Sequence, residues 1–191
     1  MSKFKKIVVR QYVDGDFDRV SEIHDLARPI ELQGSCDAQA FITLADDRDG
    51  LSDFQQSQKL VAVADDVVMG FVGISGAEVS WLYVDPTAFG SRIGAKLLLN
   101  AFAAMDHIPI AYVLAGNVTA RKFYHHFGFQ EVTQFDSDNN GYPCRVIKLQ
   151  MECKNVYPTA PAGLNSQRYR AAVKAERKNA RDWSRSVGIS A

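Results

Sequence analysis

The chain has 191 residues, with 22 Lys and Arg against 22 Asp and Glu, and 47% of its residues are hydrophobic. This length suits one domain plus an appendage, with enough apolar residues for a sizeable core. The apolar runs are too short to span a membrane, and no signal-peptide core follows the basic N-terminus, so we expect a cytoplasmic protein.

The net charge of zero conceals an asymmetry between the two parts of the chain. Residues 1–153 carry 14 Lys and Arg against 20 Asp and Glu, a net charge of −6, whereas residues 154–191 carry 8 against 2, a net charge of +6. An acidic body favours a cationic substrate over nucleic acid. The basic tail could touch an acidic partner, RNA or the body itself, or simply be exposed and kept soluble by its charge. We therefore predict a domain over 1–153 and a basic, partly helical extension over 154–191.

The cysteines and histidines show no metal pattern. Cys36, Cys144 and Cys153 are odd in number, far apart in the chain and without paired zinc-ligand spacing, so we expect reduced thiols. The four histidines form no motif either, and adjacent His125 and His126 would not share a helix face. No metal site is predicted.

The first part of the chain predicts a strand, a helix and an irregular segment. Residues 7–13 alternate between apolar and polar as a strand does. A turn at 14–16 supplies an N-cap for a helix whose apolar face runs from Phe17 to Ala27, and Pro29 is expected to end it. Residues 30–58 are polar and irregular, with one or two short helices.

A meander and a crossover unit follow. Strands are predicted over 59–64, 67–75 and 78–84, and their short connections indicate antiparallel neighbours. Helical spacing of apolar residues predicts a helix over 91–105, and 110–114 is a short apolar strand. A strand, a crossover helix and a strand form a βαβ unit, so the last pair is expected to be parallel.

The remaining elements complete an α+β domain. A helix over 118–126 stops at Gly128, and strands over 129–135 and 145–151 flank the turn-rich segment 136–143. The predicted architecture is a mixed, mostly antiparallel sheet of about seven strands with helices on its faces.

The turn between the third strand and the crossover helix is a candidate anion site. Helix N-termini bind anions because their first N–H groups lack intrahelical partners, and glycine lets the backbone approach closely. The residues concerned are Phe89, Gly90, Ser91, Arg92, Ile93, Gly94 and Ala95. The same turn could equally be an ordinary connection between a strand and its crossover helix.

A second block carries a family resemblance. Asn117, Ala120, Phe123, Tyr124, Gly128 and Phe129 match the pattern Asn-x-x-Ala-x-x-Phe-Tyr-x-x-x-Gly-Phe at every fixed position. Together with the turn, this block resembles the GNAT superfamily of acetyl-CoA-dependent N-acetyltransferases over about residues 5–152. The turn of that family reads Gln/Arg-x-x-Gly-x-Gly/Ala, whereas here Phe89 and Arg92 depart from it and only Gly94 matches.

The resemblance implies a fold and a set of roles. The central parallel strands should splay into a V, with the turn 89–95 on the pyrophosphate of coenzyme A. The backbone of Leu82, Tyr83 and Val84, and the side chain of Asn117, would contact the pantetheine arm. Tyr124 would stabilise or protonate the departing thiolate, since a phenol can act as a general acid.

The reaction also needs a base for the attacking amine. Glu78 opens the central strand, and a Glu on this strand is the base in some relatives; by alternation it would share a face with Ser80 and Leu82. A solvated carboxylate at the strand end is the plainer alternative. Asp85, His24 and His125 are weaker candidates for the base, and a water chain is another.

The expected function is N-acetyl transfer from acetyl-CoA to a primary amine of a small molecule or protein in a ternary complex. Two alternatives remain: a non-catalytic acyl-CoA-binding regulatory module, and an acetyltransferase whose macromolecular acceptor is docked by the basic tail. Acidic residues in 30–58 and 136–143 favour a cationic amine. The resemblance also allows a homodimer, because many domains of this family pair through their sheets.

Overall fold

The computed structural model describes Phe4 and residues 6–152. The predicted extension 154–191 and Cys153 lie outside the described residues. The strands in chain order are β1 Ile7–Gln11, β2 Gln58–Ala64, β3 Val67–Ser75, β4 Glu78–Val84, β5 Ile110–Leu114, β6 Phe129–Asn139 and β7 Tyr142–Met151. The α-helices are α1 Phe17–Leu32, α2 Arg48–Gln56, α3 Ile93–Ala104 and α4 Val118–His126, with short 3₁₀ turns at Asp14–Asp16, Ala38–Ala40 and Pro86–Ala88.

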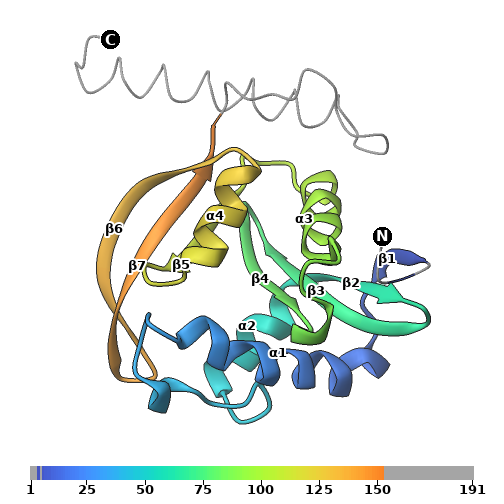
Figure 1. Cartoon of the computed structure of the whole chain (residues 1–191), viewed down its shortest axis with the longest axis horizontal. Coiled ribbons are helices and arrows are strands. Elements are labelled where there is room, and N and C mark those ends of the chain that lie inside the picture. Colours follow the sequence, from blue (N-terminus) through green and yellow to red (C-terminus); the bar gives the residue numbers. More distant parts are fainter. Residues whose placement is uncertain (1–3, 5, 153–191) are drawn as a thin grey trace.

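The strands form one seven-stranded sheet in the order β1-β2-β3-β4-β5-β7-β6. Every neighbouring pair is antiparallel except β4 and β5, which are parallel. The predicted α+β class and mixed sheet are therefore confirmed. Helices α1 and α2 cover one face of the sheet, and α3 and α4 lie on the other (Figure 1).

The two faces carry separate cores because side chains alternate along each strand. On the α3 side, Leu97 and Phe102 pack against β2 and β3 residues such as Ala62 and Val72. On the α1 side, Ile23 and other α1 residues pack with Phe54 of α2 and with β2 and β3. None of the helices in residues 4 and 6–152 has the length and hydrophobicity that spanning a membrane requires.

The parallel pair is splayed. Its register holds a single pair, Glu78 opposite Ile110, beside one hydrogen bond from Ile110 N to Ala77 O of 2.9 Å. Beyond that point β4 continues to Val84 and β5 to Leu114 without pairing to each other. The two strands therefore diverge into the V that the resemblance implied.

Pro29 does not end the first helix, contrary to the sequence-based prediction. Proline removes one N–H donor, but α1 continues to Leu32. Leu32 is only 1% exposed, and Arg28 pairs with Glu31 at 2.6 Å in the last turn. Burial and this ion pair outweigh the lost bond, and they bring Glu31 to the sheet.

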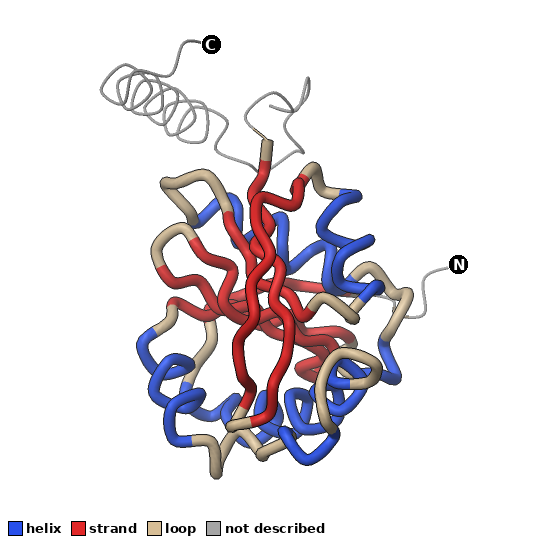
Figure 2. The backbone as a smooth tube through the Cα atoms, turned by 90° about the vertical axis from the view of Figure 1, so that its left-hand side faces the viewer, coloured by secondary structure: helices blue, strands red, loops and turns tan. Residues whose placement is uncertain are grey.

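The segment 136–143 is not the loop that its composition suggested. Strands β6 and β7 extend through it, and only Asn140 and Gly141 form the turn, with φ of 52° and 82°. Asn-Gly is the residue pair that a two-residue hairpin turn favours, because both positions need positive φ. The resulting long hairpin runs along one side of the molecule (Figure 2).

Candidate active site

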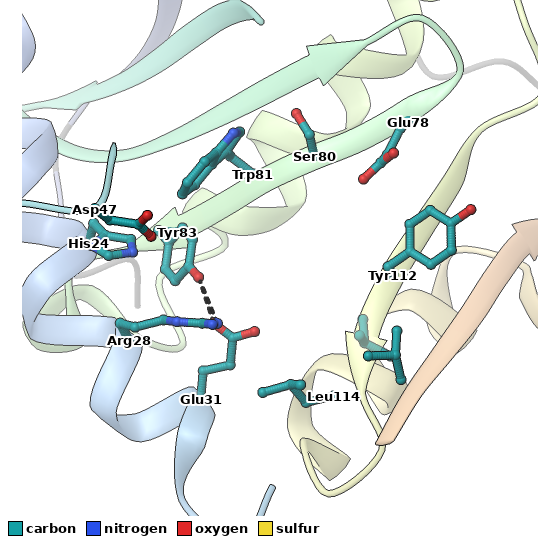
Figure 3. Close-up of a pocket in the computed structure, with 12 residues that line it drawn as sticks. His24, Arg28, Glu31, Asp47, Glu78, Ser80, Trp81, Tyr83, Tyr112 and Leu114 are labelled. Carbon is teal, nitrogen blue, oxygen red and sulfur yellow. Dashed lines mark hydrogen bonds and ion pairs between the residues drawn. The ribbon is translucent and has the colours of Figure 1, made fainter. Parts of the chain in front are cut away.

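A cavity of ≈ 260 Å³ lies where β4 and β5 diverge. Figure 3 shows residues of β4 on one side of it and Tyr112 and Leu114 of β5 on the other, with α1 residues below. The lining residues are His24, Arg28, Glu31, Asp47, Glu78, Ser80, Trp81, Tyr83, Tyr112, Val113, Leu114 and Val146. Of the sequence-predicted site, Glu78 and Tyr83 belong to this lining.

Glu78 places a carboxylate at the closed end of the V. No side chain in the described part of the chain hydrogen-bonds with that carboxylate. Burial and the charge of Asp53 raise the pKa of Glu78, while Lys148 opposes the shift. An unengaged carboxylate with a raised pKa, facing a cavity, has the properties that a general base needs.

A β-bulge changes which residues accompany Glu78. The register with β3 shifts between Gly73 and Ile74, so that Ser80 is the extra residue on β4. The bulge reverses the alternation, and Trp81 and Tyr83 line the cavity with Glu78. Leu82 packs into the core on the α3 side, so the prediction that it shares a face with Glu78 was wrong.

Helix α1 supplies polar groups that the sequence analysis did not single out. The Tyr83 hydroxyl donates to Glu31 Oε2 at 2.5 Å, and Arg28 bonds to the same carboxylate oxygen at 2.6 Å. Burial and Glu31 raise the pKa of Tyr83 far above its ordinary value, so its hydroxyl remains a donor. Arg28 and Glu31 stand three apart, a spacing that could have indicated their pairing.

The weaker base candidates have other partners. Burial lowers the pKa of His24, which lines the cavity and bonds to Asp25 at 2.8 Å. The buried Asp85 pairs with Arg19 and accepts from Thr87 N at 2.7 Å; these bonds outweigh burial and lower its pKa. Asp85 thus caps a turn, and it does not line the cavity.

His125 also lies away from the cavity lining. Its Nδ1 is 2.8 Å from the Phe129 carbonyl oxygen, and its Nε2 is 3.4 Å from Glu131. In the described part of the chain, no group of three or more His, Cys, Asp or Glu could hold a metal ion.

Tyr124 sits in the core on the opposite face of the sheet from the cavity. It is 5% exposed and packs edge-on against Phe129 at 5.0 Å. Among the described residues, the Tyr124 hydroxyl has no hydrogen-bond partner. If it were also fully buried, it would be a fully buried side-chain oxygen without a partner, and in that part of the chain Ser35 Oγ is the only such atom. The Tyr124 hydroxyl therefore retains some accessible surface.

The charge environment links Tyr124 to the cavity. Burial, followed by the charges of Glu31 and Glu78, raises the pKa of Tyr124 well above its ordinary value. Both carboxylates line the cavity, whereas Tyr124 itself does not. A role for Tyr124 as the acid and Glu78 as the base stays a prediction.

The start of α4 is set by Asn117. Its Oδ1 accepts from Ala120 N at 3.0 Å, which caps the helix that carries Tyr124. The structure therefore shows Asn117 as a helix cap. Its contact with a pantetheine arm stays a prediction. Capping also leaves the amide NH₂ of Asn117 without a partner in the described residues.

The turn before α3 keeps the geometry of an anion site. Gly90 has φ of 77°, and Arg92 is left-handed with φ of 68° at the N-cap of α3. Among the described residues, the amides of 92–95 have no acceptor, and the first bond of the helix is from Lys96 N to Arg92 O at 3.1 Å. Phe89 is 54% exposed and contributes no charge. The free amides fit a phosphate group.

The turn, β4 and α4 converge around Gly94. A Cβ at this position would lie 3.6 Å from the Phe123 ring and 3.6 Å from Val84 Cγ2. The family pattern allows Gly or Ala here, and the space present would accept either. The predicted phosphate turn therefore adjoins both the strand and the helix that the resemblance assigned to the cofactor.

The backbone of β4 offers donors and acceptors to the gap. Asp85 N donates to Met69 O of β3 at 2.9 Å, which sets the alternation of peptide groups along β4. By that alternation, the amides of Leu82 and Val84 point away from β3 and toward the unpaired side, whereas the amide of Tyr83 points to β3. Two of the three predicted backbone contacts thus have the required direction.

Replacing Arg92 with Gly is expected to raise the free energy of unfolding by about 1 kcal/mol, because a left-handed backbone penalises any Cβ. The same change removes a guanidinium beside the free amides, so affinity for coenzyme A should fall about tenfold. Thermal unfolding with and without coenzyme A measures both effects. Arg92→Lys, which keeps the charge and the strain, is the control. A less stable Arg92→Gly protein would contradict the strain argument.

Comparison with known proteins shows what part of the chain is similar to a known family. Residues 55–131 match the family model of the acetyltransferase (GNAT) domain. This stretch includes β4, the turn, α3, β5 and α4. The match confirms the resemblance inferred from the sequence. No curated protein is significantly similar to the chain in sequence.

Solved structures share the fold over nearly their whole length. A GCN5-related N-acetyltransferase from Rhodopseudomonas palustris has 17% identity and a TM-score of 0.67, covering 80% of this chain and 99% of that one. The PaiA N-acetyltransferase from Thermoplasma acidophilum, solved with coenzyme A, has 21% identity and a TM-score of 0.59 over 77% and 99%. The yncA protein from Salmonella typhimurium, solved with its cofactor acetyl-CoA, has 17% identity and a TM-score of 0.56 over 82% and 98%.

Proposed function

We propose, from the premise that this chain carries an acetyltransferase (GNAT) domain, that it transfers an acetyl group from acetyl-CoA to a primary amine in a ternary complex. The single observation that carries the proposal is the splayed β4–β5 pair, with Glu78 in the cavity on one face of the sheet and Tyr124 in the core on the other face. Direct transfer requires both reactants to meet through such a gap, with a base on the amine side and an acid on the thiolate side.

The chain's own residues fit binding of acetyl-CoA, which would supply a thioester as the acetyl donor. The free amides of 92–95 suit the pyrophosphate, and the outward amides of Leu82 and Val84 suit strand-like pairing with the pantetheine arm. The Glu78 carboxylate would take the proton from the amine, directly or through water. The Tyr124 hydroxyl would hydrogen-bond to the departing sulfur.

The lining of the cavity supports a positively charged acceptor. It carries the carboxylates of Glu31, Asp47 and Glu78 against the one guanidinium of Arg28. Trp81 adds an aromatic face that favours cations. We therefore propose an amine whose second group is cationic and lies near Asp47, at the end of the cavity opposite Glu78 (Figure 3).

The test is release of free thiol from acetyl-CoA with amines of matched size that carry or lack a second positive charge. The cationic amines should show the higher kcat/KM. Asp47 caps α2 by accepting from Gly50 N at 2.9 Å, and Asn can keep this cap while removing the charge. Asp47→Asn should therefore raise KM for the cationic amine about tenfold and leave KM for acetyl-CoA unchanged. Equal kcat/KM for charged and neutral amines would contradict the acceptor proposal.

Phe89 and Arg92 motivate a second candidate, a non-catalytic acyl-CoA-binding module, because they stand where the family pattern has Gln or Arg and Gly. Both candidates predict thermal stabilisation by coenzyme A through mass action. Only the enzyme releases thiol when an amine is present. Absence of any thermal shift at millimolar coenzyme A would contradict both.

A further inference from the structure

Two cysteines that stand far apart in the chain meet in the fold. Cys36 follows α1, and Cys144 lies on β7. The Cys36 thiol is 3.8 Å from the carbonyl oxygens of Tyr142 and Pro143, the two residues before Cys144. Burial, with the nearby Cys36, raises the pKa of the Cys144 thiol. Both are free thiols and only half-buried, so a small oxidant can reach them.

Other contacts hold the two segments together. Asn140 Nδ2 donates to Ala40 O at 2.7 Å, and the Tyr142 hydroxyl donates to Gln39 Oε1 at 2.9 Å. Farther along, a Cβ on Gly116 would lie 2.0 Å from the Gly34 carbonyl oxygen, so the backbones touch there. The segment 33–40 is therefore already docked on the hairpin and on the start of α4. These contacts hold Cys36 next to the strand that carries Cys144 before any bridge forms.

The pair lies directly behind a wall of the cavity. Cys36 and Cys144 pack in a cluster with Leu114 and Val146. Leu114 and Val146 also line the cavity. Cys36 also lies on the stretch of chain that connects two other lining residues, Glu31 and Asp47. A covalent link at this point would fix one side of the acceptor end of the cavity.

We propose that Cys36 and Cys144 form a reversible intramolecular disulfide that responds to a low-molecular-weight disulfide such as oxidised glutathione. Cys36 first attacks the glutathione disulfide as a thiolate and releases one glutathione thiolate. The Cys144 sulfur, after losing its proton, then attacks the Cys36 sulfur of the mixed disulfide and displaces the second glutathione. Two protein thiols are oxidised, and one glutathione disulfide is reduced to two thiols.

The bridge has two consequences. It closes a long loop, since 108 positions separate Cys36 from Cys144, and long closed loops stabilise a fold most. It also fixes the segment 33–40 against the hairpin and so changes access of the acceptor. The second consequence rests on the proposed acetyltransferase function, whereas the bridge itself does not.

The experiment treats the full chain with oxidised glutathione or with dithiothreitol. We expect a mass loss of two hydrogens, a cross-linked peptide containing Cys36 and Cys144, and a rise in Tm of roughly 5 °C or more. Cys36→Ser and Cys144→Ser should each abolish the cross-link and the shift. Cys153→Ser is the matched control and should leave both unchanged. Two thiols at Cys36 and Cys144 that still alkylate after oxidation, or a bridge that uses Cys153, would overturn the proposal.

Activity is measured separately on the same samples. The oxidised protein should show at least a twofold change in KM for the amine with KM for acetyl-CoA unchanged, and Cys36→Ser should show no response to oxidation. If the cross-link forms but KM for the amine does not move, the effect on the acceptor is overturned while the bridge stands. If no amine is acetylated under any condition, the proposed function fails and the mass measurement still decides the bridge.

Discussion

Replacing Glu78 with Gln is expected to lower kcat/KM about a hundredfold at neutral pH, which is the usual scale for a general base. Gln has nearly the same shape, so the start of β4 and its register with Ile110 should be retained. Among the described residues no side chain hydrogen-bonds to the Glu78 carboxylate, so the substitution removes no such bond. A loss of activity would therefore report proton transfer and not unfolding.

The pH profile gives the sharper test of Glu78. A base works as the carboxylate, so activity falls as pH falls through its pKa. Because burial and Asp53 raise that pKa, the acidic limb of kcat/KM should lie above the ordinary value for Glu. The limb should disappear in Glu78→Gln.

Two neighbouring variants should move the limb in opposite directions. Asp53→Asn removes a negative charge that raises the pKa of Glu78, so the limb should move to lower pH. Lys148→Gln removes a positive charge that lowers it, so the limb should move to higher pH. If the limb stays in place in both variants, Glu78 is not the group that titrates. Unchanged kcat/KM in Glu78→Gln would remove Glu78 from the mechanism and leave a water chain as the base.

Tyr124→Phe is expected to lower kcat about tenfold or more while KM for acetyl-CoA changes little, because the lost contact is made to the departing sulfur. The raised pKa of Tyr124 keeps its hydroxyl protonated at neutral pH, so it is available as a donor. A thiolate is a weaker base than a phenolate, so the main contribution is a hydrogen bond to the sulfur rather than complete proton transfer.

Tyr124→Phe removes the hydroxyl and keeps the packing of the ring. The ring of residue 124 packs against Phe123 and Phe129 at centroid distances of 5.6 and 5.0 Å, and Phe keeps these contacts. The hydroxyl has no partner among the described residues, so its removal leaves no group unsatisfied. We expect Tm to change by less than about 2 °C, measured beside single-turnover thiol release. Wild-type turnover in Tyr124→Phe would exclude the hydroxyl from the reaction.

The left-handed Arg92 bears on whether the departure from the family turn damages cofactor binding. The position where the pattern has Gly keeps the backbone angle that Gly would adopt, and the amides after it remain free. Arg92 therefore preserves the shape of the turn at a cost in strain and adds a charge that Gly lacks. The turn differs from the pattern in its side chains more than in its backbone.

Local signals in the sequence predicted most elements well. The bounds of β3, β4, β5 and α4 agree with the prediction, because each is a short periodic run closed by Gly, Pro or polar residues. The block from Asn117 to Phe129 carried the family resemblance, since its spacing follows one helix and its cap. The predicted bounds were wrong where two local signals competed. At Pro29 the helix continued past the proline, and at Asn140-Gly141 the strands extended through a turn-rich segment.

The candidate site was predicted only in part. Glu78 and Tyr124 could be singled out because a strand start and a helix motif are visible in sequence. Arg28 and Glu31 could not be assigned to the site, because they reach it only when α1 packs against β4 and Glu31 meets Tyr83. The bulge at Ser80 was equally hidden, since it arises from pairing with β3.

By itself, the sequence determined the type and order of the elements and carried the family resemblance, because periodicity, caps and turn residues act over a few positions. Only the tertiary structure decided the splay of β4 from β5, the face on which Glu78 lies and the meeting of Cys36 with Cys144. Each of these depends on contacts between residues that are distant in the chain. Such contacts are set by packing across the whole sheet, and no local pattern records them.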